Sequence, residues 1–254
     1  MVTRRELVTF LDDLLRPPAE LKDSSRNGLQ VEGTDAVHRV AFGVDASLAL
    51  FQAAAAWDAQ AIVVHHGLFW HEGFSRVLGA EAARLRLLLG AGLNLYASHV
   101  PLDCHPRLGN NAVIASRLGL LDVEPFGIYG GIAIGYKGKL AAAAPIAVLA
   151  DHVAVALETT CRVLEAGSSG PLASVGIISG GGADLVSQCP AAGVACLITG
   201  ELTHQCVHPA WEAATPVIAA GHYATEVWGL RALMAALQGA LPVQCRFLNL
   251  PTGY

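Results

Sequence analysis

The stretch Ala61-Ile62-Val63-Val64-His65-His66-Gly67 places two histidines at the end of a short, continuous apolar run. Apolar runs of this length that end at a glycine are typical of strands buried on both faces of a parallel sheet. In open α/β sheets, ligands bind in the crevice at the carboxyl ends of the strands. The stretch therefore predicts an α/β fold with His65 and His66 at the ligand-binding edge of a sheet.

Three further apolar runs end in side chains that can bind a metal ion: 95–98 before His99 and Asp103, 196–199 before Glu201, and 217–221 before His222 and Glu226. If the four strands are neighbours, several imidazoles and carboxylates meet at one edge. Imidazole and carboxylate groups are common ligands of divalent transition metals. The four runs together predict a metal centre at the carboxyl ends of the strands, with two ions.

The composition favours a large core and an oligomer. Of the 254 residues, 53 % are hydrophobic and 15 % are charged, which is more apolar and less charged than an average soluble protein. Part of the surface is therefore predicted to be buried in a homo-oligomer, since obligate interfaces resemble a domain core. The net charge of −5 argues against a nucleic-acid-binding surface, because phosphate contacts need a basic patch.

The sequence predicts a cytoplasmic protein with no membrane span. The uncharged run 185–200 is interrupted by Pro190 and is shorter than the roughly 18 residues a span needs. The amino terminus has the pattern of an amphipathic helix and not of a signal peptide. The six cysteines show no C-x-x-C spacing, which indicates buried thiols in a reducing compartment. Cys104 stays open as an exception because it adjoins Asp103.

Strand and helix patterns alternate, which predicts two closely packed α/β halves, 1–125 and 126–254, with largely parallel sheets. The capping-box residues Thr3 and Glu6 open the first helix, and Pro17 stops it. In the first half, strands are predicted near 37–44, 61–65 and 94–98, and helices near 47–58, 81–89 and 110–118. In the second half, strands are predicted near 159–164, 174–178, 194–199, 217–220 and 243–248, helices near 142–157, 184–189, 203–213 and 224–237, and an exposed strand or hairpin at 127–138.

Each candidate ligand also has a structural interpretation. His65 and His66 converge only if the strand breaks at Gly67, and the alternative is one core histidine and one exposed histidine. His222 and Glu226 share one helical face, but a glutamate in a first helical turn is common without any metal. Asp103 fits a helix cap or an Asx-turn equally well.

Two loops are ambiguous. Ser179-Gly180-Gly181-Gly182 lies between a predicted strand and a predicted helix, where backbone amides could hold a phosphate. The chain has no G-x-x-x-x-G-K-[ST] motif, so a tight β-α turn is favoured. Asn27-Gly28-Leu29-Gln30 either lines the site or forms a turn.

Several motifs occur in an order that resembles the Nif-three-like family of dinuclear-metal proteins, whose members are often named GTP cyclohydrolase 1 type 2 homologues. The resemblance covers nearly the whole chain, and its specific elements are His-His-Gly-Leu and Gly-His-x-x-Thr-Glu. The motifs are Asn27-Gly28-Leu29-Gln30-Val31, Val44-Asp45-Ala46-Ser47, Val63-Val64-His65-His66-Gly67-Leu68-Phe69-Trp70, Ser98-His99-Val100-Pro101-Leu102-Asp103, Ser179-Gly180-Gly181-Gly182, Thr199-Gly200-Glu201 and Gly221-His222-Tyr223-Ala224-Thr225-Glu226.

The resemblance implies a two-domain α/β subunit in its compact form and a toroidal homohexamer. By matching motifs it implies that two metal ions are bound, with Glu226 bridging them, by His65, His66, Asp103, His222 and Glu226. Many members have a second histidine after Thr-Gly-Glu, whereas this chain has Gln205. The second half would then return His222 and Glu226 to a metal site shared with the first half.

Two functions stay open. Five protein ligands leave open positions for water, which favours a metal-dependent hydrolase, and the resemblance implies GTP or a nucleotide-like substrate. The alternative is a non-catalytic metal-binding adaptor or regulatory protein, and a third interpretation is an α/β protein without metal. Zinc, iron, manganese, cobalt and nickel all suit the ligands, and the sequence does not choose among them.

His99 and Glu201 are the candidates for proton transfer or for orienting the ligands. Their favoured structural interpretations are a satisfied core histidine and a carboxylate at a helix start. The remaining histidines are weaker candidates: His71, His105, His204 and His208 near the same loops, and His38 and His152 at the periphery.

Overall fold

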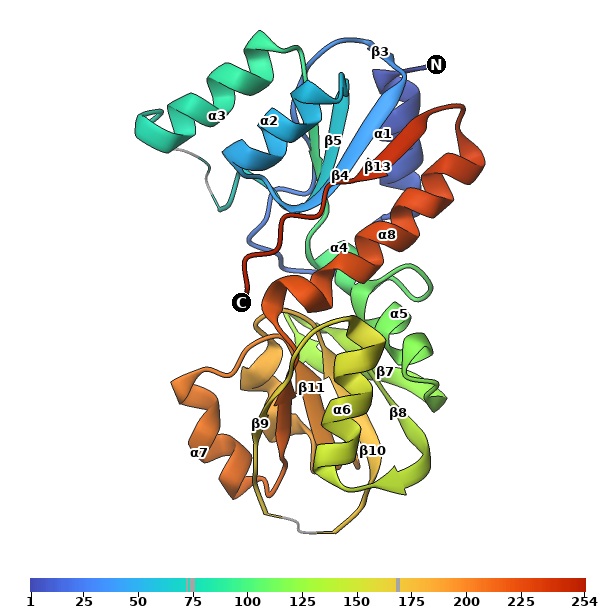
Figure 1. Ribbon diagram of the computed structural model, residues 1–254, viewed down its shortest axis with the longest axis vertical. Helices are drawn as coiled ribbons and strands as arrows, with labels where there is room; N and C mark the ends of the chain where they lie inside the picture. Colours follow the sequence, from blue (N-terminus) through green and yellow to red (C-terminus); the bar gives the residue numbers. More distant parts are fainter. Residues whose placement is uncertain (72, 74–75, 168–169) are drawn as a thin grey trace. The chain divides into compact units, whose positions relative to one another are not determined.

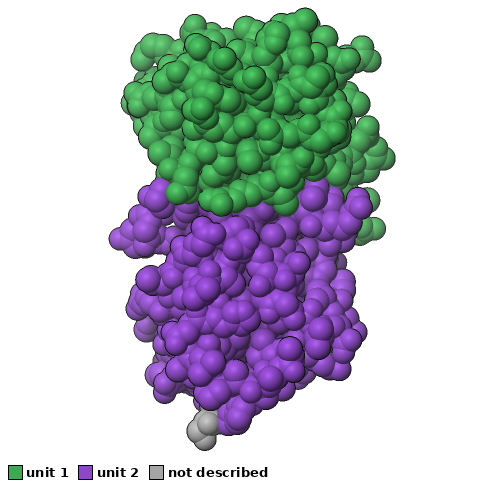
Figure 2. Space-filling view, turned by 45° about the vertical axis from the view of Figure 1, so that its right-hand side comes forward, with its two compact units in different colours: residues 1–102, 230–250 green, residues 103–229, 251–254 purple. Residues whose placement is uncertain are grey.

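The computed structural model describes residues 1–71, 73, 76–167 and 170–254, and the chain forms two compact units (Figure 1). Unit 1 contains residues 1–102 and 230–250, and unit 2 contains residues 103–229 and 251–254. Figure 2 colours unit 1 green and unit 2 purple. Each unit contains its own main sheet.

Unit 1 is built on a five-stranded sheet in the order β13-β4-β5-β6-β2. The pairings from β13 to β6 are parallel, whereas β2 pairs antiparallel with β6. The apolar runs of β4, β5 and β6 are buried and pack against α2 and α3, which explains their continuous hydrophobicity. The strands are β2 (Gly28–Val31), β4 (Arg39–Asp45), β5 (Ala61–His66), β6 (Asn94–Ala97) and β13 (Gln244–Phe247), with a separate short pair, β1 (Val2–Thr3) and β3 (Ala36–Val37).

Side-chain caps start two helices of unit 1. Thr3 Oγ1 accepts from the Glu6 amide and Glu6 accepts from the Thr3 amide, so the predicted capping box is confirmed. Ser47 accepts from the Leu50 amide at 3.1 Å and caps the next helix. The helices are α1 (Arg4–Leu14), α2 (Leu48–Ala56), α3 (Gly79–Gly90) and α4 (Val100–Asp103), the last of which ends in unit 2.

Unit 2 is built on a six-stranded sheet in the order β7-β8-β10-β11-β12-β9. Its centre, β10-β11-β12, is parallel, while the β7-β8 hairpin and β9 add antiparallel edges. The hairpin confirms the predicted exposed strand or hairpin at 127–138 and extends beyond it. The strands are β7 (Leu121–Tyr129), β8 (Ile132–Ala144), β9 (Arg162–Leu164), β10 (Leu172–Ile178), β11 (Cys196–Thr199) and β12 (Val217–Ala219).

Two helices of unit 2 differ from the sequence-based prediction. The helix predicted from residue 142 begins at Ile146, because Ala144 pairs with Leu172 in the sheet and Pro145 caps the helix. The segment predicted as a helix at 184–189 is a 3-10 helix over 182–188. The helices are α5 (Asn110–Arg117), α6 (Ile146–Leu157), η1 (Gly182–Gln188), α7 (His204–Glu212) and α8 (His222–Ala240), which ends in unit 1.

The α/β fold class with largely parallel sheets is confirmed, but the division of the chain differs from the predicted boundary at residue 125. The chain leaves unit 1 after Leu102, and the closing strand β13 returns to pair with β4. Strand pairing is not visible in the order of elements, so chain order alone misplaced β13. Among the described residues, no helix combines the length and apolarity that crossing a membrane requires.

Candidate functional site

Three histidines of unit 1 form a cluster at the carboxyl ends of β5 and β6. His65 and His66 are the last residues of β5, and His99 follows β6. The ring centroids are 4.8 Å apart for His65 and His66 and 5.0 Å apart for His65 and His99. One ligand nitrogen from each histidine lies within 4.8 Å of the others. The adjacent histidines therefore converge instead of pointing to opposite faces.

In each of these histidines, Nδ1 is held by an acceptor. His65 Nδ1 lies 2.9 Å from the carbonyl oxygen of Ser98, and His66 Nδ1 lies 2.8 Å from Asp45 Oδ1. His99 Nδ1 lies 2.8 Å from Asp23 Oδ1. A carbonyl or carboxylate oxygen can only accept, so Nδ1 carries the proton and donates it. Nε2 of each neutral ring then keeps its lone pair, which is the tautomer that binds a metal ion.

Asp23 is held more tightly than an exposed carboxylate. Its side chain is 5 % exposed and accepts from His99, from the Ser25 and Val100 amides and from Asn27 Nδ2. Burial pushes the pKa of Asp23 upward. The hydrogen bond from His99, the positive charge that this ring carries when it is protonated, and the hydrogen bonds from Asn27 and Ser25 lower the pKa to about 2. Asp23 therefore stays ionised and fixes the His99 ring.

The loop after β5 is shaped by Gln30 and Gly67. Gln30 Oε1 accepts from the Leu68 amide at 2.7 Å, and Gln30 Nε2 donates to the Arg26 carbonyl at 2.7 Å. A Cβ at Gly67 would lie 2.4 Å from Gln30 Nε2, so only glycine allows this approach. In the ambiguous segment 27–30, residues 28–30 thus belong to strand β2, and Gln30 supports the histidine loop.

In unit 2, His222 and Glu226 lie on one face of the first turns of α8. His222 Nε2 is 3.2 Å from Glu226 Oε1, and His222 Nδ1 makes a short hydrogen bond with Glu201 Oε1. Glu226 is buried, whereas the Glu201 side chain is 41 % exposed. His222 thus repeats the arrangement of unit 1, because a carboxylate holds Nδ1 and leaves Nε2 to a ligand.

Gly180 brings the glycine-rich loop against this pair. Its backbone has a φ of +61°, and a Cβ there would lie 2.2 Å from Glu226 Oε1 and 3.2 Å from His222 Nε2. Its amide donates to Thr225 Oγ1 at 3.0 Å, and its carbonyl accepts from the Gly200 and Glu201 amides. The loop is therefore a tight turn that positions Glu201 and Glu226, which supports the turn interpretation over a phosphate cradle.

Asp103 belongs to the same hydrogen-bond network of unit 2. Its Oδ1 accepts from Asn110 Nδ2 and from Ser179 Oγ, each at 2.9 Å. Asn110 Oδ1 in turn accepts from the Gly229 amide of α8 at 2.7 Å, which ties α5 to α8. The carboxylate is 7 % exposed, and its orientation is fixed by neighbours that the sequence analysis did not select.

Two of the weaker histidine candidates, His105 and His208, have structural contacts. His105 Nδ1 accepts from the Arg107 and Leu108 amides, and His208 packs edge-on against Trp211. Burial raises the pKa of the Cys189 and Cys196 thiols to about 12, so they stay protonated at neutral pH. These thiols behave as small buried hydrophobes, as the sequence predicts.

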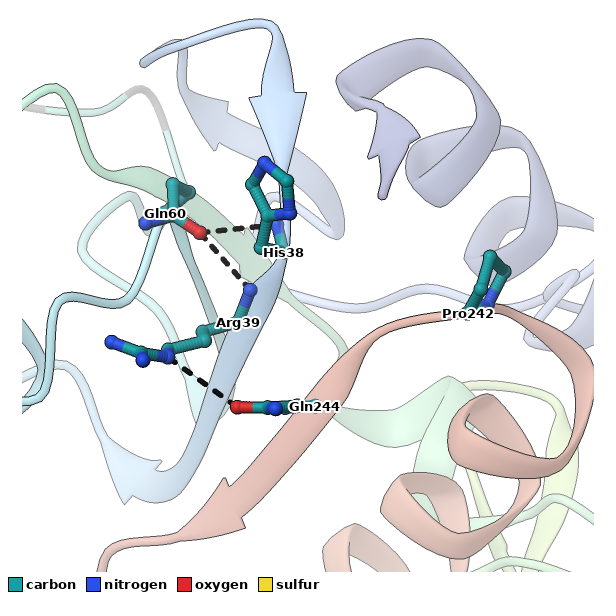
Figure 3. Close-up of a pocket in the computed structure, with 5 residues that line it drawn as sticks. All are labelled: His38, Arg39, Gln60, Pro242 and Gln244. Carbon is teal, nitrogen blue, oxygen red and sulfur yellow. Dashed lines mark hydrogen bonds between the residues drawn. The ribbon is translucent and has the colours of Figure 1, made fainter.

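A cavity of about 400 Å³ in unit 1 lies at the other edge of the sheet from the histidines (Figure 3). Arg39 and Gln244 begin the parallel strands β4 and β13, so the cavity is at the amino-terminal edge. Gln60 Oε1 accepts from the His38 and Arg39 amides at 3.0 Å, and Arg39 Nε donates to Gln244 Oε1 at 3.4 Å (Figure 3). These polar groups bind one another, and His38 is peripheral to the candidate site. The lining residues are His38, Arg39, Gln60, Pro242 and Gln244.

Apart from Glu201, the groups that hold the candidate ligands were not predicted from the sequence. Asp45 had a signal, because it ends β4 at the position that pairs with His66 at the end of β5. Asp23 lies in a loop 76 residues from His99 and had no signal in the sequence. Ser179 was noted only as the start of a glycine-rich loop.

The whole chain matches one protein-family model. Residues 2–252 match the model described as Duf34/NIF3 (NGG1p interacting factor 3). A protein of Deinococcus radiodurans named GTP cyclohydrolase 1 type 2 homolog is 43 % identical over 252 residues, covering 99 % of this chain and 95 % of the relative. A Pyrococcus horikoshii protein of the same name is 42 % identical, covering 98 % of this chain and 99 % of the relative.

Solved structures share the fold over the full length. The structure titled protein ybgI, of unknown function, has a TM-score of 0.91 and 34 % sequence identity, with 100 % of both chains covered. The protein TTHA1606 from Thermus thermophilus has a TM-score of 0.90 and 36 % identity, again with 100 % of both chains covered. Sequence and structure comparisons therefore agree on one group of proteins.

Proposed function

This chain belongs to the Duf34/NIF3 family, and from that premise we propose that it binds two divalent transition-metal ions. The proposed ligands are His65, His66, Asp103, His222 and Glu226. The observation that carries the proposal is that Nδ1 of each proposed ligand imidazole makes a hydrogen bond. The Ser98 carbonyl accepts from His65, Asp45 accepts from His66, and Glu201 accepts from His222. This arrangement fixes the ring and the tautomer before any ion arrives.

The donor set fits such ions. Neutral imidazoles and carboxylates suit zinc, iron, manganese, cobalt or nickel, and five side chains leave positions for water. We propose that both units supply ligands, His65 and His66 from unit 1 and Asp103, His222 and Glu226 from unit 2. The motif order of the family supports the same ligand set.

The proposed activity is metal-dependent hydrolysis. When bound, the ions would supply Lewis-acid chemistry, lowering the pKa of water and polarising the bond that is attacked. His99 would take up or release a proton at Nε2, since Asp23 holds its Nδ1. Glu201 would hold His222 in place and, being partly exposed, would accept a proton from solvent-accessible groups.

The proposed substrate is GTP or a related nucleotide. Its support is the name of the relatives, GTP cyclohydrolase 1 type 2 homolog, at 42–43 % identity over nearly the full chain. Hydrolysis would open the imidazole part of guanine. The net charge of −5 and the family likeness give no support to a nucleic-acid substrate.

The second candidate function is a metal-binding adaptor or regulator without catalysis. The hydrogen-bonded imidazoles also fit this function, because ligands that are fixed in place before an ion arrives would equally hold a structural or a sensed ion.

Incubation of the metal-loaded protein with GTP, followed by the absorbance of guanine, separates the two functions. A fall in the guanine absorbance with the wild-type protein, and no fall with the Glu226→Gln variant, would support the hydrolase. An unchanged spectrum with GTP and other nucleotides, at full metal content, would favour the adaptor. The Glu212→Gln variant is the matched control, because this glutamate ends α7 and is exposed.

We also propose a toroidal homohexamer in the cytoplasm. Exposed apolar side chains on β7, such as Leu121 at 53 % and Ile128 at 55 %, support burial by other copies. The protonated buried thiols Cys189 and Cys196 are consistent with a reducing compartment. Light scattering gives the mass of the assembly directly.

A further inference from the structure

Helix α6 is strongly apolar, with only Asp151 and His152 polar, although only one side faces the core of unit 2. Its sequence is Ile146-Ala-Val-Leu-Ala-Asp-His-Val-Ala-Val-Ala-Leu157, in which Asp151 is the sole Asp, Glu, Lys or Arg. Leu149, Val153 and Leu157 are buried on the inner side. A surface helix of a monomer normally places charged residues opposite such a stripe.

The outer side of α6 carries two exposed valines with two polar residues between them. Val148 is 56 % exposed and Val155 is 78 % exposed, and the two are separated by two helical turns. Asp151 and His152 lie between them and are also exposed. Figure 1 shows α6 on the outside of unit 2, in front of its sheet. Two exposed valines that flank a polar pair give the helix a mixed apolar and polar face that a partner can bury.

The sequence of α6 is partly symmetric about the bond between Asp151 and His152, although the pairs Ala150–Val153 and Leu149–Ala154 differ. Reading outward from that bond, Asp151 is opposite His152, Val148 is opposite Val155, and Ala147 is opposite Ala156. The ends, Ile146 and Leu157, are opposite each other as well. Two copies of such a helix in antiparallel contact place equivalent side chains around a twofold axis, as isologous interfaces require.

We propose that the outer face of α6 binds α6 of a second copy of this chain, antiparallel and about a twofold axis between Asp151 and His152. Val148 of each copy packs against Val155 of the other. The Asp151 carboxylate accepts a hydrogen bond from the His152 ring of the opposite copy, twice per interface. The small side chains of Ala147 and Ala156 let the two helices approach closely.

The charges on and near α6 favour a second copy of the chain over other binding partners. An anionic membrane surface would need Lys or Arg beside the exposed valines, and the chain has none between Lys139 and Arg162. A partner surface of a single charge would complement only one of the two adjacent side chains, Asp151 or His152. In a second copy, His152 lies opposite Asp151 and Asp151 lies opposite His152, so both side chains are paired in the same interface.

The first test uses the full-length protein and Val155→Lys, with Val77→Lys as the matched control on an exposed valine of unit 1. Sedimentation of the wild type should show an even number of copies. Val155→Lys should raise the dissociation constant of the two-copy contact by at least about tenfold, halving the mass of the particle at micromolar concentration. A monomeric wild type, or a variant mass equal to that of the control, would overturn the proposal.

Charge exchange tests the pairing itself. Asp151→Lys alone and His152→Glu alone should each weaken the assembly. The new lysine would face His152 of the other copy, and the new glutamate would face Asp151. The double variant should restore the assembly, since Lys at 151 meets Glu at 152 of the other copy. A double variant weaker than both single variants would overturn the antiparallel register. Metal content in the same samples keeps this result separate from the proposed function, because no proposed ligand lies on α6.

Discussion

The two groups of proposed ligands differ in chemistry and in how they are held. Unit 1 offers His65 and His66 at the end of one strand, with His99 beside them, and its ligand atoms are imidazole nitrogens. Unit 2 offers His222 with the buried carboxylates Asp103 and Glu226. In unit 1, a parallel sheet sets the positions of the ligands. In unit 2, loops and the start of α8 do so, tied by the Gly180 turn.

This difference assigns separate tasks to the two groups. Neutral imidazoles are good ligands for transition metals but carry no charge, so the histidines of unit 1 alone would not balance the charge of bound cations. Asp103 and Glu226 bring negative charge, which costs free energy to bury unless a cation or hydrogen bonds balance it. The carboxylate group should therefore depend on the metal more than the imidazole group does.

The largest effect should come from filling the space beside Glu226. Gly180→Ala places a Cβ 2.2 Å from Glu226 Oε1 at a φ of +61°, so the turn or the glutamate must move. We expect a loss of about 2–4 kcal/mol in unfolding free energy and of most of the bound metal. Urea unfolding and elemental analysis measure both quantities.

Gly181→Ala is the control for this change, because its Cβ meets no atom within 4 Å and its φ is −82°. It should retain its metal and its stability. Equal losses in the two variants would show that the loop tolerates no side chain anywhere, and that the contact with Glu226 is not the cause.

The next prediction distinguishes the proposed ligands from the side chains that hydrogen-bond to them. Asp45→Asn and Glu201→Gln each remove the charge of the group that pins Nδ1 of His66 or His222. Their side chains are 42 % and 41 % exposed, so the two changes are well matched. Each should lower metal affinity by about 10–100-fold, as measured by competition with a chelator.

Asp58→Asn, an exposed partner of Arg39, is the control and should leave affinity unchanged. Complete loss of one ion in Glu201→Gln, with only weakened binding in Asp45→Asn, would show that Glu201 is itself a ligand. The two units would then differ in the number of ligands they supply.

Much of the candidate site could be predicted, because the positions of His65, His66 and His222 follow from local patterns. An apolar run that ends at a glycine indicates where a buried strand stops, and i,i+4 spacing indicates one helical face. Asp23 could not be predicted, since its contact with His99 depends on how a loop folds back across the sheet. β13 was misplaced for the same reason: its pairing with β4 joins segments about 200 residues apart.

The smallest effect concerns stability in acid. The pKa of Asp23 is lowered to about 2 from an ordinary value of 3.8. Its stabilisation is therefore complete above pH 4 and is lost as the pH falls from 4 towards 2, by about 2 kcal/mol. In the metal-free protein, Asp23→Asn should be less stable at pH 7 and should show a flatter dependence below pH 4.

Asp13→Asn is the comparison for this change, because Asp13 is 65 % exposed and its carboxylate pairs with the exposed Arg16 on the surface. It should keep the acid dependence of the wild type. An unfolding free energy in Asp23→Asn that matches Asp13→Asn at every pH would show that Asp23 does not fix His99.

The metal content of the purified wild-type protein tests the central claim most directly. After growth with added zinc, iron, manganese, cobalt and nickel salts, elemental analysis should find about two transition-metal ions per chain. Replacing His65 and Glu226 together with alanine should remove most of this metal. A wild-type content near zero, or full retention of both ions in the double variant, would contradict the account.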